Sequence, residues 1–202
     1  CESESGGALY FQDGSSKGGE SVSIANSTFI NCFARGGEGY AISSRSYSFV
    51  IDDCSFKGHK KSTHPSAQFQ NNNIIYFGYV KIDDDGHFES PLYLNRNIFE
   101  DNSGVTSIKV ELVSSFKLPQ SISLTGCKFL NYDDLDNDKP CIDIDEITPS
   151  NDFNLVDIEF TNITNTHCIY GTHAENYPMS NIMSCKFTNI FYQAKTTEFC
   201  GA

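Results

Sequence analysis

Hydrophobic and polar positions along the chain repeat as one short unit, and each copy is centred on a phenylalanine. An apolar residue stands five positions before each phenylalanine. Another stands seven positions before it in every copy except the last, where Ser180 takes the place. Such alternation is typical of a strand with one buried face. The central residues are Phe29, Phe56, Phe99, Phe129, Phe160 and Phe187.

The alternation slips by one residue three positions before each phenylalanine, and turn-forming residues return two positions after it. Asn, Asp, Gly and Ser predominate at both places. These residue types tolerate positive φ or bond their own backbone. Each copy therefore predicts a strand, a first bend, a short strand and a second bend. The second bends form a predicted turn ladder of Asn31, Gly58, Asp101, Asn131, Asn162 and Asn189.

A third apolar stretch, such as 73–77 or 105–110, follows several copies. The central phenylalanines recur at intervals of 27, 43, 30, 31 and 27 residues, which is typical of a solenoid whose coils bury their apolar faces by stacking. The chain is predicted to be all-β, a right-handed parallel β-helix of about six to seven coils with three short parallel sheets. The right hand follows from the usual handedness of parallel crossovers. Residues 1–202 are expected to form one domain, as a segment of a longer chain or one unit of a polymer.

The charge of the chain limits its partners. The formal net charge is −12, so nucleic acid is not an expected partner and an anionic membrane surface repels the protein. No apolar run is long enough for a membrane span. Eight cysteines are many for a reduced cytosolic protein and favour an oxidising, extracellular location.

The strand Gly6-Gly7-Ala8-Leu9, coupled to Phe-x-Asn turns, resembles the repeat of chlamydial polymorphic outer membrane proteins. The chain is also similar to related β-helix surface proteins of unicellular eukaryotes. The resemblance implies a secreted or surface-displayed adhesin or structural stalk without a cofactor. It also implies surface glycans and host or matrix proteins as partners.

Two kinds of covalent modification are expected for a secreted protein. Asn26 and Asn162 stand in Asn-x-Ser/Thr motifs and are predicted to be glycosylated if the source is eukaryotic. Cys141 and Cys168 occupy the same position of successive coils, which predicts a disulfide between them. A further cysteine column, two positions before the phenylalanine, is read either as bridged or as buried thiols that pack as small apolar groups. It contains Cys54, Cys127 and Cys185.

No catalytic residue is assigned. Asp52-Asp53-Cys54 resembles the Asp-Asp-Cys motif of polygalacturonases, and Gly58-His59-Lys60 resembles their Gly-His-Gly. In that family the histidine follows a full coil later, whereas here it lies in the same coil. Asp53 also falls at a first bend, which gives it a structural role. A non-catalytic structural or adhesive protein is the favoured interpretation. The alternative is a carbohydrate-binding or pectinase-like, polysaccharide-active β-helix.

Asp134, Asp136, Asp138 and Asp145 have the spacing of a calcium-binding loop, but Lys139 stands where such a loop needs glycine. A solvated acidic loop is the favoured interpretation, and no metal is expected. Three insertions, 57–73, 83–90 and 132–140, are expected to interrupt the coils.

The two ends of the chain are expected to meet further strand layers. Neither end shows an amphipathic helix or a charged coil to cover the terminal layer, so further coils or end-to-end stacking of copies into a filament are expected. Ordinary loops that fold over each end are the alternative. Cys1 and Cys200 are the candidate residues at such a junction.

Overall fold

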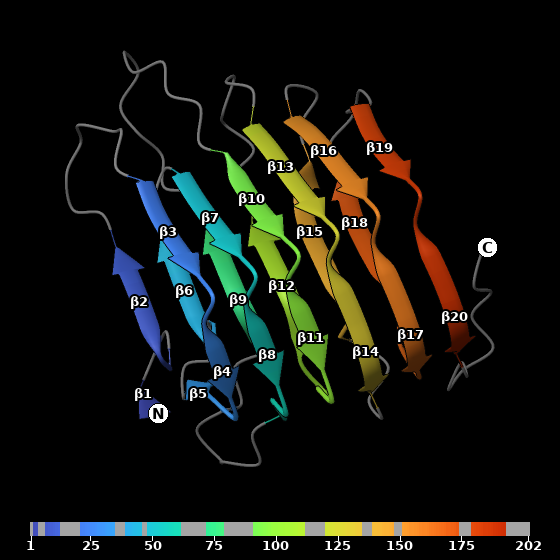
Figure 1. Cartoon of the computed structure of the whole chain (residues 1–202), viewed down its shortest axis with the longest axis horizontal. Helices are drawn as coiled ribbons and strands as arrows, with labels where there is room; N and C mark the ends of the chain where they lie inside the picture. Colours follow the sequence, from blue (N-terminus) through green and yellow to red (C-terminus); the bar gives the residue numbers. More distant parts are fainter. Residues whose placement is uncertain are drawn as a thin grey trace.

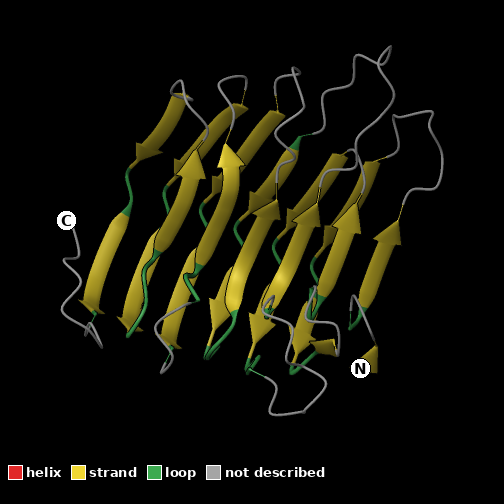
Figure 2. Ribbon diagram, turned by 180° about the vertical axis from the view of Figure 1, so that it is seen from behind, coloured by secondary structure: helices red, strands yellow, loops and turns green. Residues whose placement is uncertain are grey.

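The protein is a parallel β-solenoid with three parallel sheets, seen in a computed structural model that describes most of the chain. The described residues are 2–3, 7–12, 21–34, 39–45, 48–61, 72–78, 91–111, 120–134, 139–147, 151–173 and 179–192. Among these residues every regular element is a strand (Figure 2). The coils stack in sequence order from one end of the molecule to the other (Figure 1).

Each coil contributes one strand to each of three six-stranded sheets. Sheet I holds the strands that precede the first bends: β3 (Ser21–Ala25), β7 (Ser48–Asp52), β10 (Leu92–Asn95), β13 (Gln120–Thr125), β16 (Asn151–Val156) and β19 (Met179–Met183). Sheet II holds the strands that carry the central phenylalanines: β4 (Thr28–Ile30), β8 (Ser55–Lys57), β11 (Ile98–Glu100), β14 (Lys128–Asp133), β17 (Glu159–Thr164) and β20 (Lys186–Phe191).

Sheet III confirms the third strand that the sequence predicts for each coil. It consists of β2 (Leu9–Gln12), β6 (Ile42–Arg45), β9 (Asn73–Gly78), β12 (Thr106–Glu111), β15 (Ile142–Ile147) and β18 (Ile169–His173). A short parallel pair that the sequence analysis does not predict, β1 (Glu2–Ser3) and β5 (Phe33–Ala34), completes the described strands.

Both predicted bends have the left-handed backbone conformation in all six coils. At the first bend φ lies between 50° and 64°, in Asn26, Asp53, Arg96, Gly126, Asp157 and Ser184. At the second bend φ lies between 48° and 73° along the whole predicted turn ladder. Most residues here are Asn or Asp, whose short polar side chains tolerate this conformation. The slip in hydrophobic alternation thus marks a real change in chain direction.

The register of the strands stacks each central phenylalanine on the next. Phe29 pairs with Phe56, Phe56 with Phe99, and the series continues to Phe187. Successive ring centroids lie 4.8 to 5.1 Å apart, with interplanar angles of 4° to 14°. Aliphatic side chains five positions earlier stack in the same way inside sheet I, through Ile24, Ile51, Leu94, Leu124, Leu155 and Ile182.

Phe99→Ala or Phe129→Ala is expected to lower the free energy of unfolding by about 3–5 kcal/mol, because each ring is buried between two others and leaves a cavity. Phe187→Ala is the matched control, since this ring stacks on one side and is half exposed, and it should cost much less. Urea denaturation of the three variants measures the difference. Equal costs at Phe129 and Phe187 would contradict the stacked column as the centre of the core.

Candidate functional site

The candidate acidic residues Asp52 and Asp53 lie at a first bend, where the strands of sheet I end. The backbone continues to pair between coils even at the bend, where the Asp53 amide donates to the Asn95 carbonyl at 3.0 Å. The Arg96 amide donates likewise to the Thr125 carbonyl at 2.8 Å. Side chains at this bend therefore lie one strand spacing from the equivalent side chains of the next coil.

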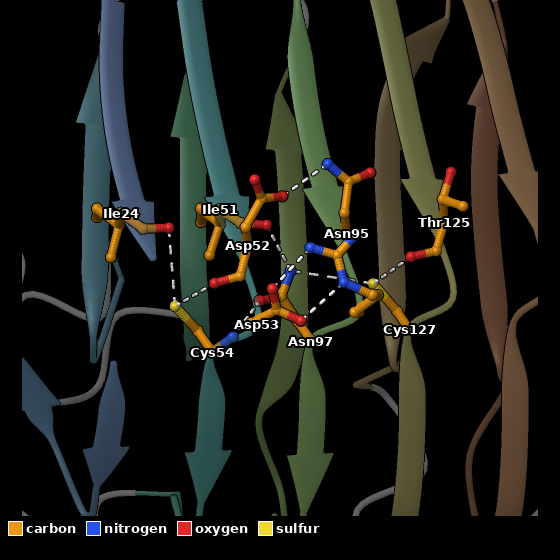
Figure 3. Close-up of polar contacts among 10 residues, drawn as sticks. Ile24, Ile51, Asp52, Asp53, Cys54, Asn95, Asn97, Thr125 and Cys127 are labelled. Carbon is orange, nitrogen blue, oxygen red and sulfur yellow. Dashed lines mark hydrogen bonds and ion pairs between the residues drawn. The ribbon is translucent and has the colours of Figure 1, made fainter. Parts of the chain in front are cut away.

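Asp53 is held by Arg96, the residue at the same bend of the next coil. The guanidinium Nε and Nη2 donate to the two carboxylate oxygens at 2.7 and 2.6 Å. Hydrogen bonding to Arg96 lowers the pKa of Asp53 and raises that of Arg96. Asp52 accepts a 2.7 Å hydrogen bond from the Asn95 amide (Figure 3). Both carboxylates of the polygalacturonase-like motif thus make contacts between coils.

His59 does not join these acids. It follows the second bend of its coil, its ring points into the core, and it is fully buried. The Asn102 side-chain oxygen accepts the His59 backbone amide at 2.8 Å and lies 3.1 Å from Nδ1. The other ring nitrogen, Nε2, is buried without a hydrogen-bond partner. Because Asn102 offers an acceptor, Nδ1 carries the proton of the neutral ring.

Two asparagines of one coil fasten that coil to the previous one. Asn97 accepts the Cys54 backbone amide at 2.9 Å and donates to the Ile51 carbonyl at 2.8 Å (Figure 3). Asn102 also donates to the Phe56 carbonyl at 3.1 Å. Both asparagines are buried. Their amides bond backbone groups beside the first and the second bend, and such groups are costly to leave unpaired. Sequence reasoning missed this function, although both lie in columns whose other members are mostly cysteine or apolar.

In other coils a cysteine thiol bonds the carbonyls at the first bend. The Cys54 sulfur lies 3.2 Å from the Asp52 carbonyl oxygen, and the Cys127 sulfur lies 3.4 Å from the Leu94 carbonyl oxygen. Burial raises the pKa of Cys127 to about 11. Of the two alternatives for this column, the structure shows free thiols for Cys54, Cys127 and Cys185. A buried thiol with a raised pKa is a weak nucleophile at neutral pH.

The predicted disulfide between Cys141 and Cys168 is absent, and both residues are free, buried thiols. Their adjacency is confirmed, since the residues that follow them, Ile142 and Ile169, are paired. In an in-register parallel ladder neighbouring side chains project in the same direction, about 4.8 Å apart. A disulfide requires the two Cβ atoms to approach to roughly 3.5–4.5 Å. Adjacency on successive coils is therefore not sufficient for a bond. Burial raises the pKa of Cys168 to about 12.

The turn ladder is a chain of side-chain hydrogen bonds on the outside of the solenoid. Asn189 donates to Asn162 at 3.0 Å, Asn162 donates to Asn131 at 2.9 Å, and Asn131 donates to Asp101 at 3.1 Å. Gly58 interrupts the polar column because a Cβ there would lie 2.6 Å from the side-chain oxygen of Asn31.

The two candidate glycosylation sites are exposed at bends. Asn26 lies at the first bend of its coil. Asn162 lies within the turn ladder, where its side-chain nitrogen donates to Asn131. A glycan on Asn162 would have to leave between two stacked asparagines, so the sites differ in their surroundings. Glycosylation of both stays a prediction.

The acidic candidates for calcium are only partly described. Asp134 is buried and accepts the Lys139 backbone amide at 2.7 Å, which closes the loop between them. Asp136 and Asp138 lie outside the described residues, and Asp145 lies in β15. Among the described residues, no three His, Cys, Asp or Glu side chains gather as a metal site.

Two of the three expected insertions include residues that belong to the coils. Lys57 ends β8, and residues 58–61 continue the coil, as do residues 132–134 at the other described insertion. Lys57 faces outward and pairs with Glu100 at 2.9 Å, so it is part of the sheet surface rather than of the predicted insertion. The insertion 83–90 and the junction candidates Cys1 and Cys200 lie outside the described residues.

Comparisons with protein-family models, curated proteins and solved structures give no match. The described residues include no helix long and apolar enough to cross a membrane.

Asn97→Ala is expected to lower the free energy of unfolding by about 2–5 kcal/mol, because it leaves the Cys54 amide and the Ile51 carbonyl buried without partners. Asn95→Ala is the matched control, since it removes a contact with Asp52 on the outer face and should cost about 1 kcal/mol or less. Chemical denaturation compares the two. An equal loss would contradict the fastening function of Asn97.

The structure also predicts a stability that depends on pH through His59. Burial lowers the pKa of His59 to about 4, against a partial opposing effect of the Asn102 hydrogen bond. In the unfolded chain the His59 side chain binds a proton near pH 6.5, whereas in the folded protein it stays neutral down to about pH 4. The contribution of neutral His59 to the free energy of unfolding is therefore complete above about pH 6.5. It is lost as the pH falls toward 4, at about 1.4 kcal/mol per pH unit. His59→Gln should reduce this slope in unfolding measurements between pH 6.5 and 4. An unchanged slope would show that His59 does not remain neutral in the folded protein.

Proposed function

We propose that the protein is a non-catalytic structural or adhesive solenoid that acts outside the cell or at its surface. The observation that carries this proposal is the use of outward-facing polar side chains as links between coils. On sheet II Glu159 lies between Lys128 at 3.3 Å and Lys186 at 3.4 Å, and both cations lower its pKa. On sheet III Lys109 pairs with Asp143 at 2.8 Å.

Contacts between coils also involve Asp52 and Asp53, the carboxylates that a pectinase-like enzyme would need. A glycosidase requires one carboxyl group with a raised pKa to protonate the leaving group, and a second carboxylate placed across the scissile bond. Asp53 has a lowered pKa and a bidentate Arg96 partner, which makes it a poor general acid. Asp52 is bonded to Asn95. These contacts favour a structural function for the pair.

The location is proposed from the sequence. The resemblance to chlamydial surface repeats, the two glycosylation motifs and the cysteine content agree with a secreted or surface-displayed protein. The six described cysteines are free thiols, so disulfides among the described residues give this location no support. Membership of the chlamydial-type repeat family, with surface glycans or host and matrix proteins as partners, belongs to this proposal.

Labelling of intact, unpermeabilised source cells with an antibody raised against the folded chain tests the location. We expect signal on the cell surface or protein in the medium, and labelling that requires permeabilisation would overturn the proposal. Release of reducing ends from polygalacturonate tests the absence of catalysis. The native chain should match the Asp53→Asn variant at background level, and release that depends on Asp53 would establish the alternative.

A further inference from the structure

The two ends of the stack differ in how well their core columns are covered. In the last coil Ile182, Phe187 and Ile190 are 55%, 52% and 38% exposed. Their equivalents one coil earlier, Leu155, Phe160 and Ile163, are all 0% exposed. The last described layer therefore presents the inside of the solenoid to solvent.

At the opposite end these three columns are buried. In the first coil the same three columns are occupied by Ile24, Phe29 and Cys32, which are 9%, 8% and 7% exposed. Within the described residues, one end thus offers a broad apolar surface and the other does not. The filament expected from the sequence requires two open ends, because head-to-tail stacking places the last coil of one copy on the first coil of the next.

The backbone and the charge of the last layer, residues 179–192, also favour contact with another chain. Within the described residues, β19 and β20 each pair with a strand on one side, as the last members of sheets I and II (Figure 1). Their other edges present backbone groups able to pair with a further strand. Residues 179–192 contain one charged side chain, Lys186, although the whole chain carries a net charge of −12. Two copies that meet at this layer therefore bring few charged side chains together.

We propose that residues 179–192 form a self-docking surface that joins two copies of the chain last coil to last coil. A surface that meets its own copy is related by a two-fold axis, so the contact closes at a dimer. The edges of β20 then run antiparallel, and their backbone groups can pair as in an antiparallel sheet. Phe187, Ile182 and Ile190 are the apolar anchors that this contact removes from water. The proposal concerns assembly and does not depend on where the protein acts.

Sedimentation of the chain across a range of concentrations, with reductant present so that cysteines cannot link copies, tests the proposal. We expect a species of twice the 22.4 kDa chain mass that dissociates on dilution. Phe187→Glu should raise the dissociation constant by about 30-fold or more, the effect of losing one buried aromatic anchor. Unchanged circular dichroism would show that the variant still folds.

Ile30→Glu is the matched control, because Ile30 is an exposed apolar residue on β4 at the other end and should leave the dimer intact. Three results would each overturn the proposal. These are a monomer at every concentration, a mass that grows beyond the dimer as in head-to-tail stacking, and a dimer that Ile30→Glu disrupts while Phe187→Glu does not.

Discussion

Parallel pairing between coils puts the same position of the repeat on top of itself, and every other feature of the molecule depends on this. A phenylalanine meets a phenylalanine at ring spacings of 4.8 to 5.1 Å, which the strand spacing itself imposes. An asparagine meets an asparagine and forms a side-chain ladder. A residue is therefore tolerated according to how it stacks on its counterpart, as well as how it fits its own coil.

The sequence predicts the parts of the fold that repeat. The phenylalanine column, both bends and the three sheets could be read because the same residue types return at the same positions. The features that occur once could not be predicted from the sequence. Asn97 and Asn102 are polar residues in columns that are otherwise mostly cysteine or apolar, and only their contacts with the previous coil explain them. Lys57 is the first residue of the predicted insertion 57–73, whereas its partner Glu100 lies on the neighbouring strand of sheet II.

The candidate site shows the same division. The place of Asp53 at a bend follows from the repeat, but its partner Arg96 breaks the pattern of small polar residues and so could not be anticipated. The Cys141 and Cys168 positions were aligned correctly, and the error lay in treating alignment as sufficient for a bond. How closely the two Cβ atoms approach, which the spacing of residues in a sequence does not reveal, decides such cases.

The left-handed bends have a consequence for how such a molecule can change in length. Since both bends recur in every coil, a duplicated coil repeats the same two bends and adds about one strand spacing, ~4.8 Å, to the long axis. Its phenylalanine and its bend asparagine would meet the same residues above and below. Gene duplication could therefore adjust the reach of the protein in small, even steps, except at layers such as that of Asn97 and Asn102, whose buried amides require specific backbone partners in the previous coil.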